Sequence, residues 1–183
     1  MINIPELTKL YKYPRQPAIF FLFVFIVYVK ISIVDEKLLR GPSPFPLTVF
    51  KLKRQGITQI CDLQHDCAFS VILKKITCKF LNINYKNTTF HIGKGELPDT
   101  IFFSTLNDNI MQNNGKTYLH CKKGRHRTGI AVAFYNLAKG KEVKKIIEED
   151  LIGMGYGTHG RFTPSKIRNA MKKILADFKK QYG

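Results

Sequence analysis

Apolar residues alternate between strand-like runs and helical spacings from about residue 31 onward. Residues 57–63 (ITQICDL) form a β-branched run typical of a strand, and residues 47–56 before them have the pattern of a helix that ends at a glycine. Apolar side chains between residues 96 and 115 recur at helical spacing. This alternation predicts an α/β domain whose central, mostly parallel sheet is flanked by helices. Further expected elements are strands over 31–34 and 75–85, a loop over 40–46 and a final helix over 163–183.

The first thirty residues have a different pattern. Three basic residues precede twelve consecutive apolar residues, Ala18–Val29, and the apolar character continues to Val34 with one interruption at Lys30. A full membrane span takes roughly 20 residues, so the run suits a short anchor or a signal-peptide core. No small-x-small cleavage site follows, which favours a retained anchor over a cleaved signal or a buried strand or helix. We therefore expect an N-terminal basic and hydrophobic segment over 1–30, membrane attachment through 18–34, and a separate domain over 31–183.

Net charge narrows the class of ligand. The chain of 183 residues carries a formal charge of +17, spread along most of its length. Such a field attracts phosphates, nucleic acids or anionic lipids. The cysteines show neither zinc-type spacing nor a CxxC pair, so free thiols are expected rather than a structural metal or a disulfide framework; they are Cys61, Cys67, Cys78 and Cys121. Asp62, His65 and Asp66 are irregularly spaced, which indicates a solvated turn rather than a metal site.

The stretch KTYLHCKKGRHRTGIAV, residues 116–132, combines a thiol with a dense group of cations. Thr117–His120 is expected to form a strand, Cys121–Arg127 a loop, and Thr128–Ala138 an apolar helix. The loop would then present its N–H groups at a helix N-terminus, which binds anions, and Gly124 would permit the tight curvature. A cysteine in this position is expected to be held as a thiolate.

Two side chains after the thiol add to this chemistry. Arg127 has a planar fork that matches two phosphoryl oxygens, and Thr128 places a hydroxyl near the sulfur. Together with Cys121 they predict nucleophilic phosphoryl transfer through a phosphocysteine, which requires neither a metal nor an organic cofactor. A nucleophilic thiol is preserved best in a reducing cytosol, which favours the cytoplasmic side of a membrane for the domain.

The order H-C-x-x-G-x-x-R-T-G resembles the signature of the cysteine-dependent protein tyrosine and dual-specificity phosphatases. The loop CKKGRHRTG looks most like the atypical dual-specificity group of plants, fungi and bacteria, some of whose members hydrolyse inositol pyrophosphates. The likeness covers roughly Val34 to Tyr156 and includes RGPSPFP, GITQICDL and GMGYG. It implies a dual-specificity phosphatase-like fold. The matching signature positions are His120, Cys121, Gly124, Arg127, Thr128 and Gly129.

Phosphatases of this chemistry use a carboxylic acid to protonate the leaving oxygen. Asp99 in ELPD resembles the I-P-D element of the atypical group, although the acid of typical dual-specificity enzymes lies further upstream. Asp99 also suits a helix N-cap, because an apolar helix is expected to follow it. Glu96 is the other candidate acid, and no acid is needed if the leaving group is itself a phosphate.

The basic loop residues bear on the substrate. They can neutralise several phosphates at once, which favours an inositol polyphosphate, a pyrophosphate or a phosphoinositide over a single phosphotyrosine; these residues are Lys122, Lys123, Arg125 and His126. His120 is expected to fix the loop by hydrogen bonding. One alternative to an enzyme is a catalytically silent module that binds phosphate or anionic lipid. A second is a nucleic-acid-binding protein, which the high net charge would also suit. No specific nucleic-acid module is recognised.

Overall fold

The computed structural model describes residues 31–64, 68–90, 100–156 and 164–182. Five strands form one sheet in the order β1-β2-β5-β3-β4. The pairing of β1 with β2 is antiparallel, and the other three pairings are parallel. The expected α/β architecture with a mostly parallel sheet is therefore confirmed. The strands are β1 (Ser32–Ile33), β2 (Leu38–Pro42), β3 (Ile57–Asp62), β4 (Asn84–Asn87) and β5 (Lys116–Cys121).

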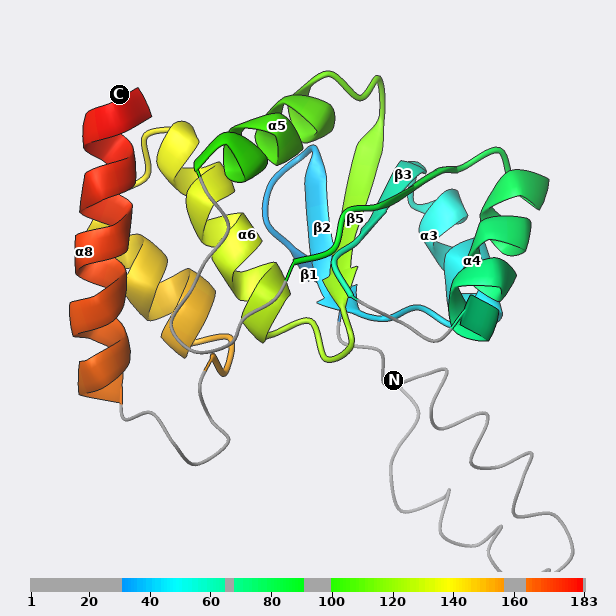
Figure 1. The fold of residues 1–183 in the computed structure, drawn as a ribbon. Coiled ribbons are helices and arrows are strands. Elements are labelled where there is room, and N and C mark those ends of the chain that lie inside the picture. Colours follow the sequence, from blue (N-terminus) through cyan, green and yellow to red (C-terminus); the bar gives the residue numbers. More distant parts are fainter. Residues whose placement is uncertain (1–30, 65–67, 91–99, 157–163, 183) are drawn as a thin grey trace, which may run out of the picture.

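Helices cover both faces of the sheet (Figure 1). Neighbouring strand residues point to opposite faces, so Tyr118 joins one buried cluster and Leu119 the other. The cluster of Tyr118 includes side chains of α3 (Pro46–Arg54) and α4 (Ala68–Phe80). The cluster of Leu119 packs against the remaining helices, which are α5 (Thr100–Met111), α6 (His126–Ala138), the short α7 (Val143–Lys145), the π-helical segment η2 (Ile146–Ile152) and α8 (Pro164–Tyr182).

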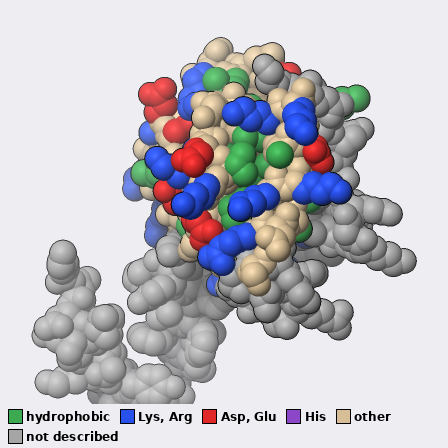
Figure 2. Space-filling view, turned by 90° about the vertical axis from the view of Figure 1, so that its left-hand side faces the viewer, with side chains coloured by type: hydrophobic (Ala, Val, Ile, Leu, Met, Phe, Trp, Pro, Cys, Tyr) green, Lys and Arg blue, Asp and Glu red, His purple; other side chains and the backbone are tan. Residues whose placement is uncertain are grey.

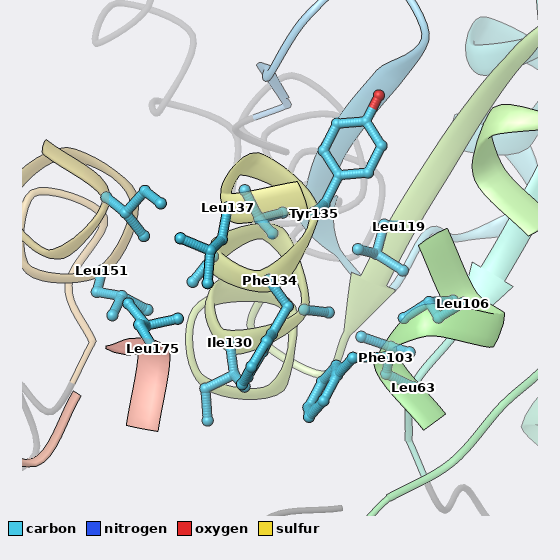
Figure 3. Packing of buried hydrophobic residues seen from close by; sticks show 14 of the residues in the cluster. Leu63, Phe103, Leu106, Leu119, Ile130, Phe134, Tyr135, Leu137, Leu151 and Leu175 are labelled. Carbon is cyan, nitrogen blue, oxygen red and sulfur yellow. The ribbon is translucent and has the colours of Figure 1, made fainter. Parts of the chain in front are cut away.

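Helix α6 is the most buried helix of the described residues. Every residue from Thr128 to Leu137 is buried. Phe134 stacks on Phe103 of α5 with ring centroids 4.0 Å apart, and its ring edge also meets Phe178 of α8. Figure 3 shows α6 between Phe103 on one side and Leu151 and Leu175 on the other. Packing on all sides fixes the position of the helix, and with it the loop that precedes its first turn.

Two sequence predictions fail. The strand expected over 75–85 is wrong for its first part, because residues 68–80 form α4 and only Asn84–Asn87 form a strand. The loop expected over 40–46 is also wrong in part, since Arg40–Pro42 belong to β2, which pairs with β5. The helix over 47–56 and the strand over 57–63 are confirmed as α3 and β3, within a residue or two.

The N-terminal segment 1–30 lies outside the described residues. Within the part of the chain that the structure describes, no helix combines the length and the apolar character that a membrane span needs.

Candidate active site

The predicted thiol lies where three parallel strands end. Cys121 is the last residue of β5, and the sheet register places it opposite Pro42, the last residue of β2. His120 lies opposite Asp62, the last residue of β3. The chain then passes through residues 122–125 into α6 at the lower edge of the sheet in Figure 1. Ligand sites of open α/β sheets form at this carboxyl edge, where the N-terminus of α6 can contribute its unpaired N–H groups.

Gly124 determines the course of this loop. Its φ is +68°, in the left-handed region that favours glycine. A Cβ at this position would lie 2.3 Å from the carbonyl carbon of Gly41 and 2.7 Å from the nitrogen of Pro42. The backbone N–H of Ser43 also donates to the carbonyl of Lys122, at 3.3 Å. The loop therefore rests directly on the end of β2, and a side chain at position 124 would displace it.

Arg40 of β2 ties the loop to the rest of the domain. Its guanidinium donates through Nη2 to the carbonyl of Gly124 at 3.1 Å and through Nη1 to the carbonyl of Asp150 at 2.9 Å. The side chain is 2% exposed. Burial lowers the pKa of the Arg40 guanidinium, and the nearby Asp150 and Cys121 side chains oppose that shift. Arg40 binds the Gly124 carbonyl and places a positive charge near the thiol. The sequence did not predict this role.

Arg127 and Thr128 both lie in the first turn of α6. Arg127 donates through Nη1 to the carbonyl of Leu63 at 2.8 Å, which links the turn to the end of β3. An arginine carries several N–H donors, so this bond is compatible with the phosphate contact predicted for it. The Thr128 hydroxyl is fully buried and has no hydrogen-bond partner among the described residues.

The remaining basic residues of the loop differ in exposure. Lys122, Lys123 and Arg125 are exposed, whereas His126 is half-buried. The His126 ring meets the ring of Tyr156 edge to face, with centroids 5.5 Å apart. Burial raises the pKa of the Tyr156 hydroxyl. The structure thus brings the loop residues named by the sequence together in one segment, with three cations at the surface.

Comparison with known proteins finds solved structures with a similar fold. No family model and no curated protein matches the sequence. Among solved structures, TpbA of P. aeruginosa matches with a TM-score of 0.66 and 15% identity, over 84% of this chain and 91% of that chain. The catalytic core of the PP-IP phosphatase SIW14 of S. cerevisiae matches with a TM-score of 0.60 and 15% identity, over 80% and 91%. PTPMT1 in complex with PI(5)P matches with a TM-score of 0.61 and 14% identity, over 84% and 99%.

The fold is that of the cysteine-based phosphatases. At these identities the likeness concerns the fold alone. The phosphatase fold agrees with the resemblance seen in the signature residues, and it places the loop of Cys121 between the sheet and a buried helix.

A buried polar cluster lies at the end of β3, next to the strand that carries Cys121. The carboxylate of Asp62 is fully buried and lies 2.5 Å from the ammonium of Lys74 and 2.7 Å from the hydroxyl of Tyr85. The Nε2 atom of His120 is 3.6 Å from the same carboxylate. The solvated turn expected at Asp62 is therefore wrong, because Asp62 compensates a lysine buried in α4. The His120 Nε2 atom is too far from this carboxylate for a hydrogen bond, so the role expected for His120 stays a prediction.

Two other cysteines of the described chain have shifted pKa values. Burial raises the pKa of Cys61 to about 12 and that of Cys78 to about 11. Both thiols are free and buried in the two clusters of the core. Their shifted pKa values make them poor nucleophiles at neutral pH.

Several predicted residues lie outside the described part of the chain. They are the candidate acids Asp99 and Glu96, and His65, Asp66 and Cys67. Within the described ranges, no three or more His, Cys, Asp or Glu side chains are grouped so that they could hold a metal ion.

Proposed function

We propose that this chain is a cysteine-dependent phosphatase that hydrolyses phosphate esters through a phosphocysteine. The observation that carries the proposal is the position of Cys121 at the end of β5, followed by a loop that turns at Gly124 into the N-terminus of buried α6. This arrangement directs backbone N–H groups and the positive end of the helix dipole toward a bound anion. The phosphatase fold supports the same chemistry.

The reaction proceeds in two displacement steps. The Cys121 sulfur attacks phosphorus, an S–P bond forms, and the P–O bond to the leaving group breaks. Arg127 and the loop N–H groups bind the equatorial oxygens, while Asp99 supplies a proton to the leaving oxygen. Water then attacks phosphorus, the S–P bond breaks, and inorganic phosphate is released with the thiolate restored. The buried Thr128 hydroxyl is suited to stabilise the sulfur as it leaves.

We infer that the substrate carries several phosphates. The exposed Lys122, Lys123 and Arg125 can bind phosphates beside the one that reacts. Structural neighbours of the chain include a PP-IP phosphatase and a protein crystallised with PI(5)P, which supports an inositol pyrophosphate or a phosphoinositide. TpbA in complex with pTyr is another neighbour, so a phosphotyrosine peptide belongs among the substrates tested.

We also propose that the apolar run before the domain attaches the protein to a membrane and that the domain faces the cytoplasm; of the expected segment 18–34, residues 31–34 belong to the domain, where Ser32–Ile33 form β1. This proposal rests on the apolar run Ala18–Val29 and on the reactivity of a thiol.

Phosphate release by the full chain tests the function. The substrates are an inositol pyrophosphate, a phosphoinositide and a phosphotyrosine peptide, each with a chelator present. We expect release that Cys121→Ser abolishes and that Cys78→Ala, a change at another buried thiol, leaves intact. Binding of all three substrates without any release would instead identify a silent phosphate-binding module.

A further inference from the structure

Helices α3 and α4 expose an unusual number of large apolar side chains. Seven of the ten exposed large hydrophobic residues of the described chain belong to these helices or precede α3 directly. Phe80 is 77% exposed and Ile76 61% exposed. Contiguous apolar surface of this kind marks an interaction site rather than a random surface feature. We call it the α3/α4 face, and its apolar members are Phe45, Leu47, Phe50, Ile72, Leu73, Ile76 and Phe80.

The face is continuous across the two helices. The Phe50 ring of α3 and the Phe80 ring of α4 have centroids 6.5 Å apart. Ile72, Ile76 and Phe80 are spaced four residues apart, so they form one stripe along α4. The same helices cover the sheet with other side chains, among them Leu52 and Cys78. The exposed residues are therefore additional to those that the core requires.

The charges on this face have a single sign. Neither α3 nor α4 contains an aspartate or a glutamate. Their exposed charged residues are all basic, namely Lys51, Arg54, Lys75 and Lys79. The face of α8 differs, because there Lys and Arg are interspersed with Asp and Glu (Figure 2). Exposed apolar side chains among cations, without acids, are the combination that binds an anionic bilayer.

The α3/α4 face lies close to the candidate site. Helix α3 follows directly after β2, and Ser43 between them donates to the carbonyl of Lys122 in the loop. Ile31 packs against the cluster beneath the two helices, and it directly follows the apolar run and Lys30. A bilayer at this face would therefore lie near Ile31, the first described residue, and near the edge of the sheet that carries Cys121.

We propose that the α3/α4 face docks the domain on an anionic lipid bilayer. The apolar side chains enter the interface between headgroups and acyl chains, and the lysines and Arg54 bind lipid phosphates and carboxylates. This inference is independent of turnover at Cys121. It adds a second membrane contact to the attachment proposed for the N-terminal segment.

A tryptophan probe tests the docking directly, because the chain contains no tryptophan. The full chain with Phe80→Trp is mixed with phosphatidylcholine vesicles that contain brominated phosphatidylserine. Its matched control is Ile101→Trp on α5, a position that is 65% exposed. We expect a blue shift and bromine quenching for Phe80→Trp and neither for Ile101→Trp. Vesicles of brominated phosphatidylcholine alone should quench Phe80→Trp weakly.

Charge variants in the Phe80→Trp protein test the electrostatic part. Lys75→Gln/Lys79→Gln should weaken lipid binding by about thirtyfold, since each of the two lysines contributes about 1 kcal/mol near an anionic surface. Lys172→Gln/Lys173→Gln on α8 is the matched control and should change it by less than about twofold. Equal effects of the two pairs would overturn the electrostatic argument.

Other results would overturn the proposal as a whole. An emission that vesicles leave unchanged and unquenched would exclude bilayer contact at Phe80. A blue shift in the absence of vesicles would mean that the chain itself or a second copy covers the face. The probe is also placed in the Cys121→Ser protein, in which quenching should persist. A protein that is quenched but never releases phosphate would contradict the proposed function and leave the docking surface intact.

Discussion

Replacement of Arg40 by lysine tests whether the buried arginine positions the signature loop. Arg40 reaches the carbonyl of Gly124 at 3.1 Å and that of Asp150 at 2.9 Å, and these acceptors belong to different segments. Lysine keeps the charge, but its single ammonium cannot reproduce the two-pronged geometry of a guanidinium. Arg40→Lys should therefore lose at least one charged hydrogen bond and leave a buried carbonyl without its donor.

The magnitude follows from the bond that is lost. A hydrogen bond from a charged donor contributes about 1.5–3 kcal/mol when it is buried. If about 2 kcal/mol of this loss appears in the transition state, kcat/KM falls by about thirtyfold. We expect a decrease of that order toward the best of the three substrates proposed above, together with a lower Tm.

The assay compares kcat/KM and Tm for the wild type, Arg40→Lys and Arg168→Lys. Arg168 is a suitable control because it also binds two acceptors, the carboxylate oxygens of Glu148 at 2.6 and 3.0 Å, but in a pair whose side chains are 43% and 41% exposed. Such a surface pair contributes little, so neither quantity should change much. A folded Arg40→Lys protein with a lower Tm and an unchanged kcat/KM would refute a positioning role and leave Arg40 as a stabilising residue only.

Three further predictions concern the loop, the buried thiols and the polar cluster. Gly124→Ala should abolish activity and should lower the free energy of unfolding by about 2 kcal/mol more than Gly140→Ala does. Both glycines have positive φ, but only Gly124 is crowded by neighbouring backbone. Equal losses of unfolding free energy for the two variants in denaturant would contradict this. Iodoacetamide at pH 7 should modify Cys121 before Cys61 and Cys78, because burial raises the pKa values of those two thiols to about 12 and 11. Peptide mass spectra in which either of them is labelled first would refute Cys121 as the nucleophile. Asp62→Asn should lower the free energy of unfolding by about 3–5 kcal/mol, since it leaves the buried ammonium of Lys74 uncompensated. A loss below about 1 kcal/mol would show that the Asp62–Lys74 ion pair is dispensable.

The sequence predicted those parts of the fold in which local pattern and burial agree. The strand before Cys121, the loop with its glycine and the apolar helix after it are encoded by consecutive residues. The helix over 47–56 and the strand over 57–63 were predictable for the same reason. In β3, β5 and α6 the apolar residues pack against the core. In α3 only Val49 and Leu52 do so, and the glycine that follows the helix indicates its end.

Helix α4 was not predictable in this way. Its apolar residues Ile72, Ile76 and Phe80 lie on the exposed side, while Lys74 is buried. The pattern therefore contradicts the usual rule that the apolar face of a helix packs inward. Its β-branched residues favoured a strand instead. The same inversion is the basis of the docking surface proposed for α3 and α4.

The supporting residues of the site depend on contacts between distant parts of the chain. Arg40 lies 84 residues from its acceptor Gly124 along the chain. Its strand also contains a glycine and a proline, and these two residues favoured a loop in the sequence pattern. Asp62 pairs with Lys74 of α4, the helix that was predicted in part as a strand. Such pairs become visible only when the order of the strands is known.

Direct detection of the covalent intermediate tests the central claim. The full chain is mixed with substrate, stopped with denaturant within the first turnover, digested and analysed by mass spectrometry. The account predicts a phosphoryl group on the peptide that contains Cys121, which is absent from Cys121→Ser and disappears as turnover is completed. Phosphate release with no phosphoryl group on Cys121, or with the group on another residue, would contradict it.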